Sequence, residues 1–399
     1  MFSKNLGIAA FTLACAWPSA AAFAAPAQDP IRIGLVTSIS GVFAPQGDDV
    51  QRGVKFAVDE ANAHGGIAGR KVEVQSGDDE STPEAGRRAA EKLARNGYNL
   101  LTGAISSAIS LALSQSLDRW NALYISANSK SDRLTGDACK MRMFRVNQSD
   151  SMDITMLSLW LKSVPQKKFA IVAADYAWGH DSADLFTQAA QKLGKQVVLT
   201  VSAPMGTKDF APYISQVKAS GADAVWVALV GEDTIAFAKQ SAQFALPAAA
   251  RIIGHAQLLG FTVAAAGTAM TGTEGNIVYA PEIPTPLNKS FVANWRKTYH
   301  RDPSDVEAAS YNGVQVIFQG VQESGSVQPL DVAKALGGLK MNSIFGPTVM
   351  RAADHQLEMP DYIGQVKVVN GTATAVLEQT FEAPSVVPPV SHACVLPAA

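Results

Sequence analysis

Polar side chains follow two predicted strands at the points where those strands end. Ser106 and Ser107 come after one of these strands, and the run Asn128, Ser129 and Lys130 comes after the next. In a doubly wound α/β sheet, ligands bind outside the carboxyl ends of the strands. Hydroxyls, strand-end N–H groups and an ammonium could together hold a carboxylate there. The alternatives are a plain helix N-cap for the serines and a solvated surface position for the lysine.

No pattern of catalytic residues accompanies these loops. The six histidines show no metal-type pairing, and the chain has neither a glycine-flanked nucleophilic serine nor a phosphate loop. His180 lies close to Tyr176 and Trp178, but no base–nucleophile pair is present. We therefore expect a binding protein without metal or cofactor, and not an enzyme. A hydrolase and a sensory receptor module are the alternatives from other classes.

The opening unit of the chain reads as strand, loop, helix and strand. The apolar segment 31–36 is followed by a loop at 37–47 and by a helix with an apolar face that ends at a glycine-marked turn. Strand and helix patterns then alternate, which predicts an α/β protein of doubly wound sheets. The further predicted strands are 100–105, 122–127, 169–175, 196–203, 222–230 and 251–256, and the predicted helices include 183–194, 209–221, 233–246 and 286–299.

Three further segments read as crossings between two α/β series. They are residues 144–150, 275–284 and 345–356, and a hairpin around Asn370-Gly371 follows them. We expect two doubly wound lobes joined by a three-crossing hinge. Lobe 1 comprises residues 25–147 and 279–352, and lobe 2 comprises residues 148–278 and 353–399.

The first 24 residues read as a secretory signal peptide. Lys4 precedes a short apolar run, and small residues at Ala22 and Ala24 mark a cleavage site. Cys15 raises the alternative of a lipoprotein, although Thr12 occupies the position at which a lipid-attachment motif normally has leucine. We expect an exported, periplasmic protein that is cleaved near Ala24.

Composition agrees with a large exported globular protein. The chain has 399 residues, 47% of them hydrophobic, and a formal net charge of −2, so nothing calls for nucleic acid or an acidic membrane surface. Processing would leave two of the three cysteines, Cys139 and Cys394. In an oxidising compartment such a pair predicts a disulfide, and two buried free thiols are the alternative.

The segment 48–82, DDVQRGVKFAVDEANAHGGIAGRKVEVQSGDDEST, resembles a specific family. It matches the pattern of the periplasmic solute-binding proteins of the branched-chain amino acid type, which serve ABC importers. Further markers are found at 134–139, 175–181 and 310–314. The resemblance implies a type I periplasmic binding protein fold, a small-molecule ligand, an ABC permease as partner and a monomer. Members of the branch bind aromatic and other organic acids as well as amino acids, so the ligand stays open.

The resemblance also assigns roles in the first lobe. Ser107 matches the serine whose hydroxyl and N–H hold the ligand carboxylate, and Ser106 adjoins it. Asn128 and Ser129 match positions that contribute backbone groups, and Lys130 falls where the family has a threonine. We expect Ser107 and Lys130 to bind the carboxylate, with Lys130 supplying the charge.

In the second lobe, Trp178 matches an aromatic residue that stacks on the ligand, and Tyr176 lies beside it. The alternative is core packing, which is common for tryptophan. The family places another aromatic residue near Leu229 or Val230, where this chain is aliphatic.

The position of the family's acid that binds the α-ammonium aligns with Ala256, which cannot do so. Glu232 could replace this acid, although an exposed acid at a helix start is its stronger reading. Phe43 could add an apolar wall. Because a buried ammonium needs a charged partner, the sequence predicts an apolar or aromatic carboxylate rather than a free α-amino acid.

Overall fold

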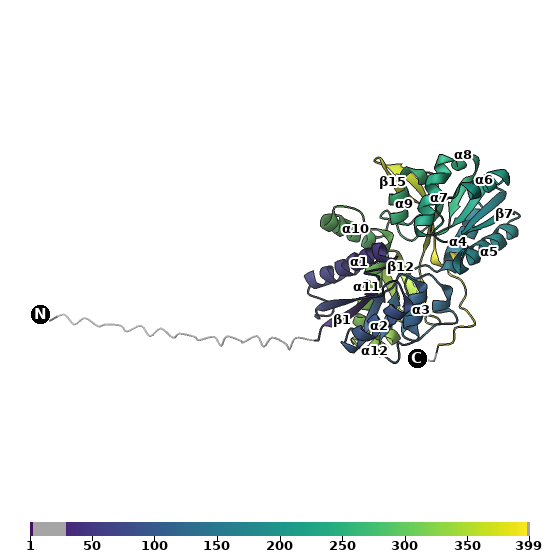
Figure 1. The fold of residues 1–399 in the computed structure, drawn as a ribbon. Coiled ribbons are helices and arrows are strands. Elements are labelled where there is room, and N and C mark those ends of the chain that lie inside the picture. Colours follow the sequence, from purple (N-terminus) through teal and green to yellow (C-terminus); the bar gives the residue numbers. More distant parts are fainter. Residues whose placement is uncertain (3–28, 397–399) are drawn as a thin grey trace.

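The computed structural model describes residues 1–2 and 29–396, which build two α/β lobes around two main sheets (Figure 1). The predicted signal peptide and its cleavage point near Ala24 lie almost wholly outside the described residues. Within residues 29–396, no helix is both long and apolar enough to cross a membrane. The predicted fold class, two doubly wound α/β lobes, is confirmed.

The first lobe is built on a five-stranded parallel sheet with the order β2-β1-β3-β4-β5. The interior strand β1 is buried at nearly every position, because helices cover both faces of the sheet. The strands are β1 (Ile31–Thr37), β2 (Val72–Asp78), β3 (Leu100–Gly103), β4 (Leu123–Ser126) and β5 (Met143–Arg145).

Helices cover both faces of this sheet. Helix α11 packs along α1, and its Ser304–Glu307 capping box fixes its start, while Thr82 caps α2. The helices of this lobe are α1 (Ala44–Ala63), α2 (Pro83–Arg95), α3 (Ser107–Ser114), α10 (Pro286–Tyr299), α11 (Asp305–Ser324) and α12 (Pro329–Leu336), with a short 3₁₀ helix at Asp132–Thr135.

The second lobe is built on a seven-stranded sheet with the order β15-β14-β10-β9-β8-β6-β7. Five strands are parallel, and β14 and β15 add an antiparallel edge. The strands are β6 (Lys168–Ala174), β7 (Gln196–Ala203), β8 (Ala224–Ala228), β9 (Arg251–Gly254), β10 (Glu274–Ile277), β14 (Asp361–Val369) and β15 (Thr372–Phe381).

Helices flank this sheet as well, and α4 links it to the first lobe because α4 begins directly after the first crossing. The helices are α4 (Asp150–Leu161), α5 (Ala177–Lys192), α6 (Ala211–Ala219), α7 (Gly231–Gln243), α8 (Leu246–Ala249) and α9 (Gly260–Ala266), with a 3₁₀ turn at Gly267–Met270 and a final helix α13 (Ala383–Val386).

The hairpin predicted around Asn370-Gly371 is confirmed as β14–β15. Asn370 and Gly371 both have positive φ, at 50° and 80°. Two adjacent residues of this kind characterise the two-residue turn that matches the twist of a hairpin.

The third predicted crossing, 345–356, is wrong in its position. Within this segment, Gly346–Met350 forms β12, the middle strand of a small antiparallel sheet with β11 (Lys340–Ser343) and β13 (Leu357–Glu358). The chain enters the seven-stranded sheet only at Asp361. A short apolar strand does not reveal in its own sequence which sheet it joins, because that depends on distant partners.

One buried side chain ties the three crossings together. The Gln148 amide nitrogen, in the first crossing, donates to the carbonyl of Val278 at 3.3 Å and to that of Pro360 at 3.2 Å. Val278 follows β10 in the second crossing, and Pro360 precedes β14 in the third. Gln148 is fully buried, so these bonds are shielded from competing water.

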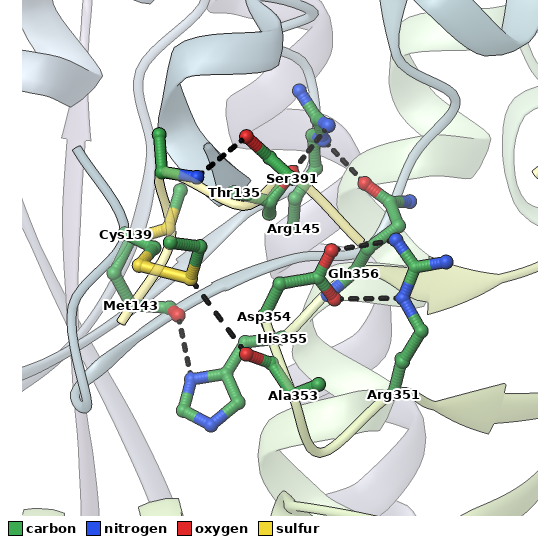
Figure 2. Close-up of a disulfide and its surroundings, with 12 residues drawn as sticks. Thr135, Cys139, Met143, Arg145, Arg351, Ala353, Asp354, His355, Gln356 and Ser391 are labelled. Atoms are coloured by element: carbon green, nitrogen blue, oxygen red, sulfur yellow. Dashed lines mark hydrogen bonds and ion pairs between the residues drawn. A yellow bond between two sulfur atoms is a disulfide. The ribbon is translucent and has the colours of Figure 1, made fainter. Parts of the chain in front are cut away.

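The predicted disulfide between Cys139 and Cys394 is confirmed (Figure 2). Their Cα atoms lie 5.6 Å apart, within the range that a disulfide spans. The bond anchors the C-terminal tail beside the loop that follows β4. Nearby, the buried His355 ring stacks on Phe144 with centroids 3.9 Å apart.

Candidate ligand-binding site

The serine loop after β3 lies at the start of α3. Ser106 is the N-cap residue, and its side chain makes no capping hydrogen bond. The Ser107 hydroxyl accepts a hydrogen bond from the N–H of Ser131 at 3.1 Å. A hydroxyl that accepts one bond can still donate its own hydrogen. Ser107 is therefore joined to the loop of Lys130 and can still donate to a ligand.

The loop after β4 uses two of its polar side chains within the lobe. The Asn128 amide donates to the Ser310 hydroxyl of α11 at 3.1 Å. Ser129 is fully buried, and its hydroxyl lies 3.2 Å from the carbonyl of Ala104 and 3.1 Å from that of Ile105. The Ser129 hydroxyl and one donor of the Asn128 amide are thus used within the first lobe.

The ammonium of Lys130 already has a partner within the protein. Its ammonium donates to Asp153 of α4, and the Lys130 side chain is only 18% exposed. The lysine is therefore not a solvated surface residue, and a buried carboxylate already faces its charge. Although burial opposes the charged form, Asp153 and then Asp361 raise the pKa of Lys130.

Asp153 is the centre of a buried charged cluster, which we define as Lys130, Asp150, Asp153, His255 and Asp361. The His255 Nε2 atom lies 3.6 Å from the Asp153 carboxylate. Burial opposes ionisation of Asp153, but Lys130 and then His255 hold its pKa below the ordinary value. One oxygen each of Asp150, Asp153 and Asp361 has no hydrogen-bond partner. The cluster thus contains more acceptors than the protein itself satisfies.

The aromatic pair of the second lobe lies against this cluster. Tyr176 and Trp178 stack with ring centroids 6.1 Å apart, and the Trp178 ring lies 5.1 Å from that of His255. Both aromatic side chains are half-buried. Burial raises the pKa of Tyr176 to about 12, so its phenol stays neutral. Through His255 and Asp153, the structure brings this pair together with Lys130.

A hydrogen-bonded chain holds His255 from behind. The Trp226 indole donates to the Ser182 hydroxyl at 3.1 Å, and that hydroxyl lies 2.9 Å from Nδ1 of His255. All three residues are buried. The ring of His255 is therefore fixed by the interior of the second lobe while its Nε2 faces Asp153.

Atoms of Asp150, Asp153 and His255 lie within 4.8 Å of one another, a spacing that a metal ion could bridge. The Lys130 ammonium already occupies one oxygen of Asp153, and it would repel a second cation. The donor set therefore fits an internal ion pair better than a metal centre.

Glu232 does not join the site. It pairs with Lys208 at 2.6 Å, and both side chains are more than 70% exposed. Glu232 is thus an exposed acid at the start of a helix, which was the stronger of its two interpretations from the sequence. Val230 is the half-buried N-cap residue of α7, and Leu229 before it is fully buried.

Ala256 and Phe43 lie at loop positions. Ala256 has a left-handed backbone with φ of 56°, and its N–H donates to the Asn276 side chain at 2.8 Å. It follows His255 directly in the chain and brings no charged or polar side chain. Phe43 is the half-buried N-cap residue of α1.

Sequence reasoning missed Asp153, His255, Asp150 and Asp361. Asp153 and His255 are 102 positions apart, and no local spacing connects them. The one available signal was Lys130 itself, because a lysine at a buried strand end requires a carboxylate partner. That requirement does not identify which acidic residue is the partner of Lys130.

A pH effect on stability follows from Asp361. Burial, and then the charge of Asp153, raise its pKa well above the ordinary value. Since the folded state binds this proton more tightly, the stabilisation is complete below the unfolded pKa of about 4 and is lost as the pH rises through the folded pKa. Asp361→Asn should reduce this loss and stabilise the protein at pH 8, as measured by urea unfolding at several pH values. The exposed Asp184→Asn is the matched control, and equal pH profiles for wild type and Asp361→Asn would contradict the assignment.

A surface hollow of about 420 Å³ lies elsewhere. It is lined by β11, β12 and residues 382–384 and contains none of the predicted site residues.

Comparison with known proteins gave concordant results. A sequence model described as "Periplasmic binding protein" matches residues 30–373. The Leu/Ile/Val-binding protein homolog 4 of Brucella abortus (strain 2308) is 23% identical over 407 residues, covering 96% of each chain.

Two solved structures are similar in fold. An amino acid ABC transporter substrate-binding protein from Pseudomonas fluorescens Pf-5 has a TM-score of 0.83 and 22% identity, covering 93% of this chain and 100% of its own. A solute-binding protein from Rhodopseudomonas palustris BisB5, in complex with 3,4-dihydroxybenzoic acid, has a TM-score of 0.79 and 23% identity, covering 89% and 98%.

Proposed function

The chain belongs to the family of periplasmic binding proteins, and we propose that it captures an apolar or aromatic carboxylate between its lobes for an ABC importer. In this family it is a solute-binding protein rather than an enzyme. Its partners are a small-molecule ligand and a membrane permease. A monomer that is exported and cleaved near Ala24 is part of the proposal.

The aromatic pair Tyr176 and Trp178 carries the proposal. Its rings connect through His255 and Asp153 to the first-lobe loop, and Ala256, which follows His255 in the chain, carries no charge. An aromatic ring can stack on such a pair while its carboxylate meets Ser107 and strand-end N–H groups. The similar protein bound to 3,4-dihydroxybenzoic acid agrees with this class of ligand.

An α-amino acid is the second candidate. The unpartnered oxygens of Asp150 and Asp153 could accept hydrogen bonds from a ligand ammonium. The names of the curated relatives agree with this class. Because Lys130 already pairs with Asp153, we favour the ligand without an ammonium. No comparison supports the sensory-receptor alternative.

A ligand screen by thermal shift separates the candidates, because a ligand that binds the folded state raises the melting temperature. The screen should include benzoate, hydroxybenzoates, aliphatic acids, leucine and valine. We expect the aromatic or apolar acids to raise the melting temperature. A response to leucine and valine with none to the acids would favour the second candidate.

Hinge closure accompanies binding in this proposal. The predicted lobes, residues 25–147 with 279–352 and residues 148–278 with 353–399, stay a proposal. The pairing of β13 with β12 supports moving the third boundary to between Glu358 and Asp361. The lobes also touch where the Gly260 N–H, at the start of α9, donates to Asp305 of α11 at 3.3 Å. Small-angle scattering should show a smaller radius of gyration at saturating ligand, and an unchanged radius would count against closure.

Replacement of Ser107 by alanine should weaken binding of benzoate. A hydrogen bond to a charged group is worth about 1.5–3 kcal/mol, so the loss should be roughly tenfold or more. Lys130→Met should weaken benzoate more than benzamide, since only the acid needs the charge. Ser114→Ala, at the other end of α3, is the control for Ser107, and calorimetry is the measurement. If Lys130→Met leaves benzoate affinity unchanged, another group meets the ligand's charge.

A further inference from the structure

The Lys130–Asp153 pair connects the two halves of the proposed site. Lys130 follows β4 of the first lobe, while Asp153 lies in the first turns of α4, which packs on the second lobe. Asp153 has no exposed surface. A carboxylate in such a place is stable only with a charged partner and further hydrogen bonds. Lys130 supplies the partner, and the second lobe must supply the remainder.

His255 is the group that the second lobe supplies, and its neighbours fix its tautomer. An indole N–H can only donate, so the Ser182 hydroxyl accepts from Trp226. The hydrogen of Ser182 is then best satisfied by Nδ1 of His255, 2.9 Å away, because a buried hydroxyl hydrogen without an acceptor is costly. With Nδ1 accepting from Ser182, the N–H of a neutral imidazole lies on Nε2. That atom faces the Asp153 carboxylate at 3.6 Å, just beyond hydrogen-bond distance, and has no other partner among the described residues.

We propose that Asp153 is a positioning residue of the ligand site. It orients Lys130, cancels the charge of Lys130 and so sets the charge of the ligand that the site accepts, while His255 lies beside it on the side of the second lobe. This inference rests on the proposed function for its binding consequences. With both charges present, the pair is neutral, and a ligand carboxylate must share Lys130 with Asp153. Loss of the Asp153 charge should therefore raise the preference for a carboxylate over its neutral amide, and loss of the Lys130 charge should lower it.

Two single variants and their combination test this idea. Asp153→Asn keeps the shape and an oxygen for Lys130 but leaves a positive site, so the affinity ratio of benzoate to benzamide should rise about tenfold. Lys130→Met leaves a negative site, so the same ratio should fall by a similar factor. The double variant is neutral and should return the ratio towards that of the wild type. A merely structural role would weaken both probes equally in each variant, and that result would overturn the proposal.

Two measurements without ligand keep the inference separate from the proposed function. In thermal unfolding, Lys130→Met should lower the melting temperature much less in the Asp153→Asn background than in the wild type, because the pair is already broken there. Long-range ¹H–¹⁵N spectra should show neutral His255, assigned with His255→Gln, with its hydrogen on Nε2. Trp226→Phe should release this preference, since Ser182 could then accept from Nδ1.

The outcomes are distinct. If benzoate binds to no variant while the two substitutions remain coupled in unfolding, the proposed ligand class fails and the positioning of Lys130 by Asp153 stands. Additive effects on the melting temperature, or a hydrogen on Nδ1 of wild-type His255, would overturn the inference whatever the ligand is.

Discussion

Arg145→Met is expected to destabilise the protein by about 3–5 kcal/mol, because it removes a buried charge that satisfies several acceptors. The Arg145 side chain is 2% exposed. Its guanidinium donates to the Gln356 amide oxygen and to the Thr135 hydroxyl at 2.7 Å. Figure 2 shows Arg145 between these groups. Methionine leaves both of them without their donor.

The same substitution should weaken ligand binding. Arg145 also donates to the backbone carbonyls of Lys130 at 3.0 Å and Ser131 at 2.5 Å. These bonds fix the loop that carries the proposed carboxylate-binding groups. Urea unfolding and calorimetry with the best ligand of the screen measure the two effects. Arg133→Met, in the same loop but 64% exposed, is the matched control and should change stability by less than about 0.5 kcal/mol. Similar stability losses in the two variants would contradict the buried role of Arg145.

Removal of the disulfide is expected to cost about 2–5 kcal/mol. The cysteines are 255 positions apart, so the bond closes a long loop and restricts the unfolded chain strongly. The double variant Cys139→Ser/Cys394→Ser should unfold at lower urea concentration than the oxidised mature protein.

A reducing agent provides the internal control for that measurement. Reduction should shift the unfolding curve of the mature protein towards that of the double serine variant and leave the variant itself unchanged. Alkylation of the unreduced mature protein followed by mass spectrometry should find no free thiol. Two labelled cysteines, or equal stability of the two proteins, would contradict the assignment.

Local patterns in the sequence predicted the fold well where the physical cause was local. The Asn370-Gly371 turn and the helix Pro286–Tyr299 follow from residue types at fixed spacing. The third crossing was misplaced because the sheet to which β12 belongs is decided by its pairing with β11 and β13. Short strands of this kind carry little information about their partners.

The candidate site was predictable only in its outline. Ser107 and Lys130 could be placed at strand ends, because the fold class brings strand ends to one edge. The partner of Lys130 could not be predicted, since Asp153 reaches it only through the packing of α4 against the crossing segments. Glu232 is a candidate that the structure places outside the site. In sequence, an acid at a helix start that contacts a ligand cannot be distinguished from one that pairs with an exposed lysine, as Glu232 does with Lys208.

The disulfide also determines how the molecule responds to a cut in its backbone. Residues 139 to 394 form a covalent ring that includes every strand of the seven-stranded sheet and all three crossings. A single nick in any loop of this ring opens it without producing a second molecule. The nicked chain therefore keeps its full mass on a denaturing gel until a reducing agent is added. A nick before Cys139 is different, since it releases an N-terminal fragment without reduction.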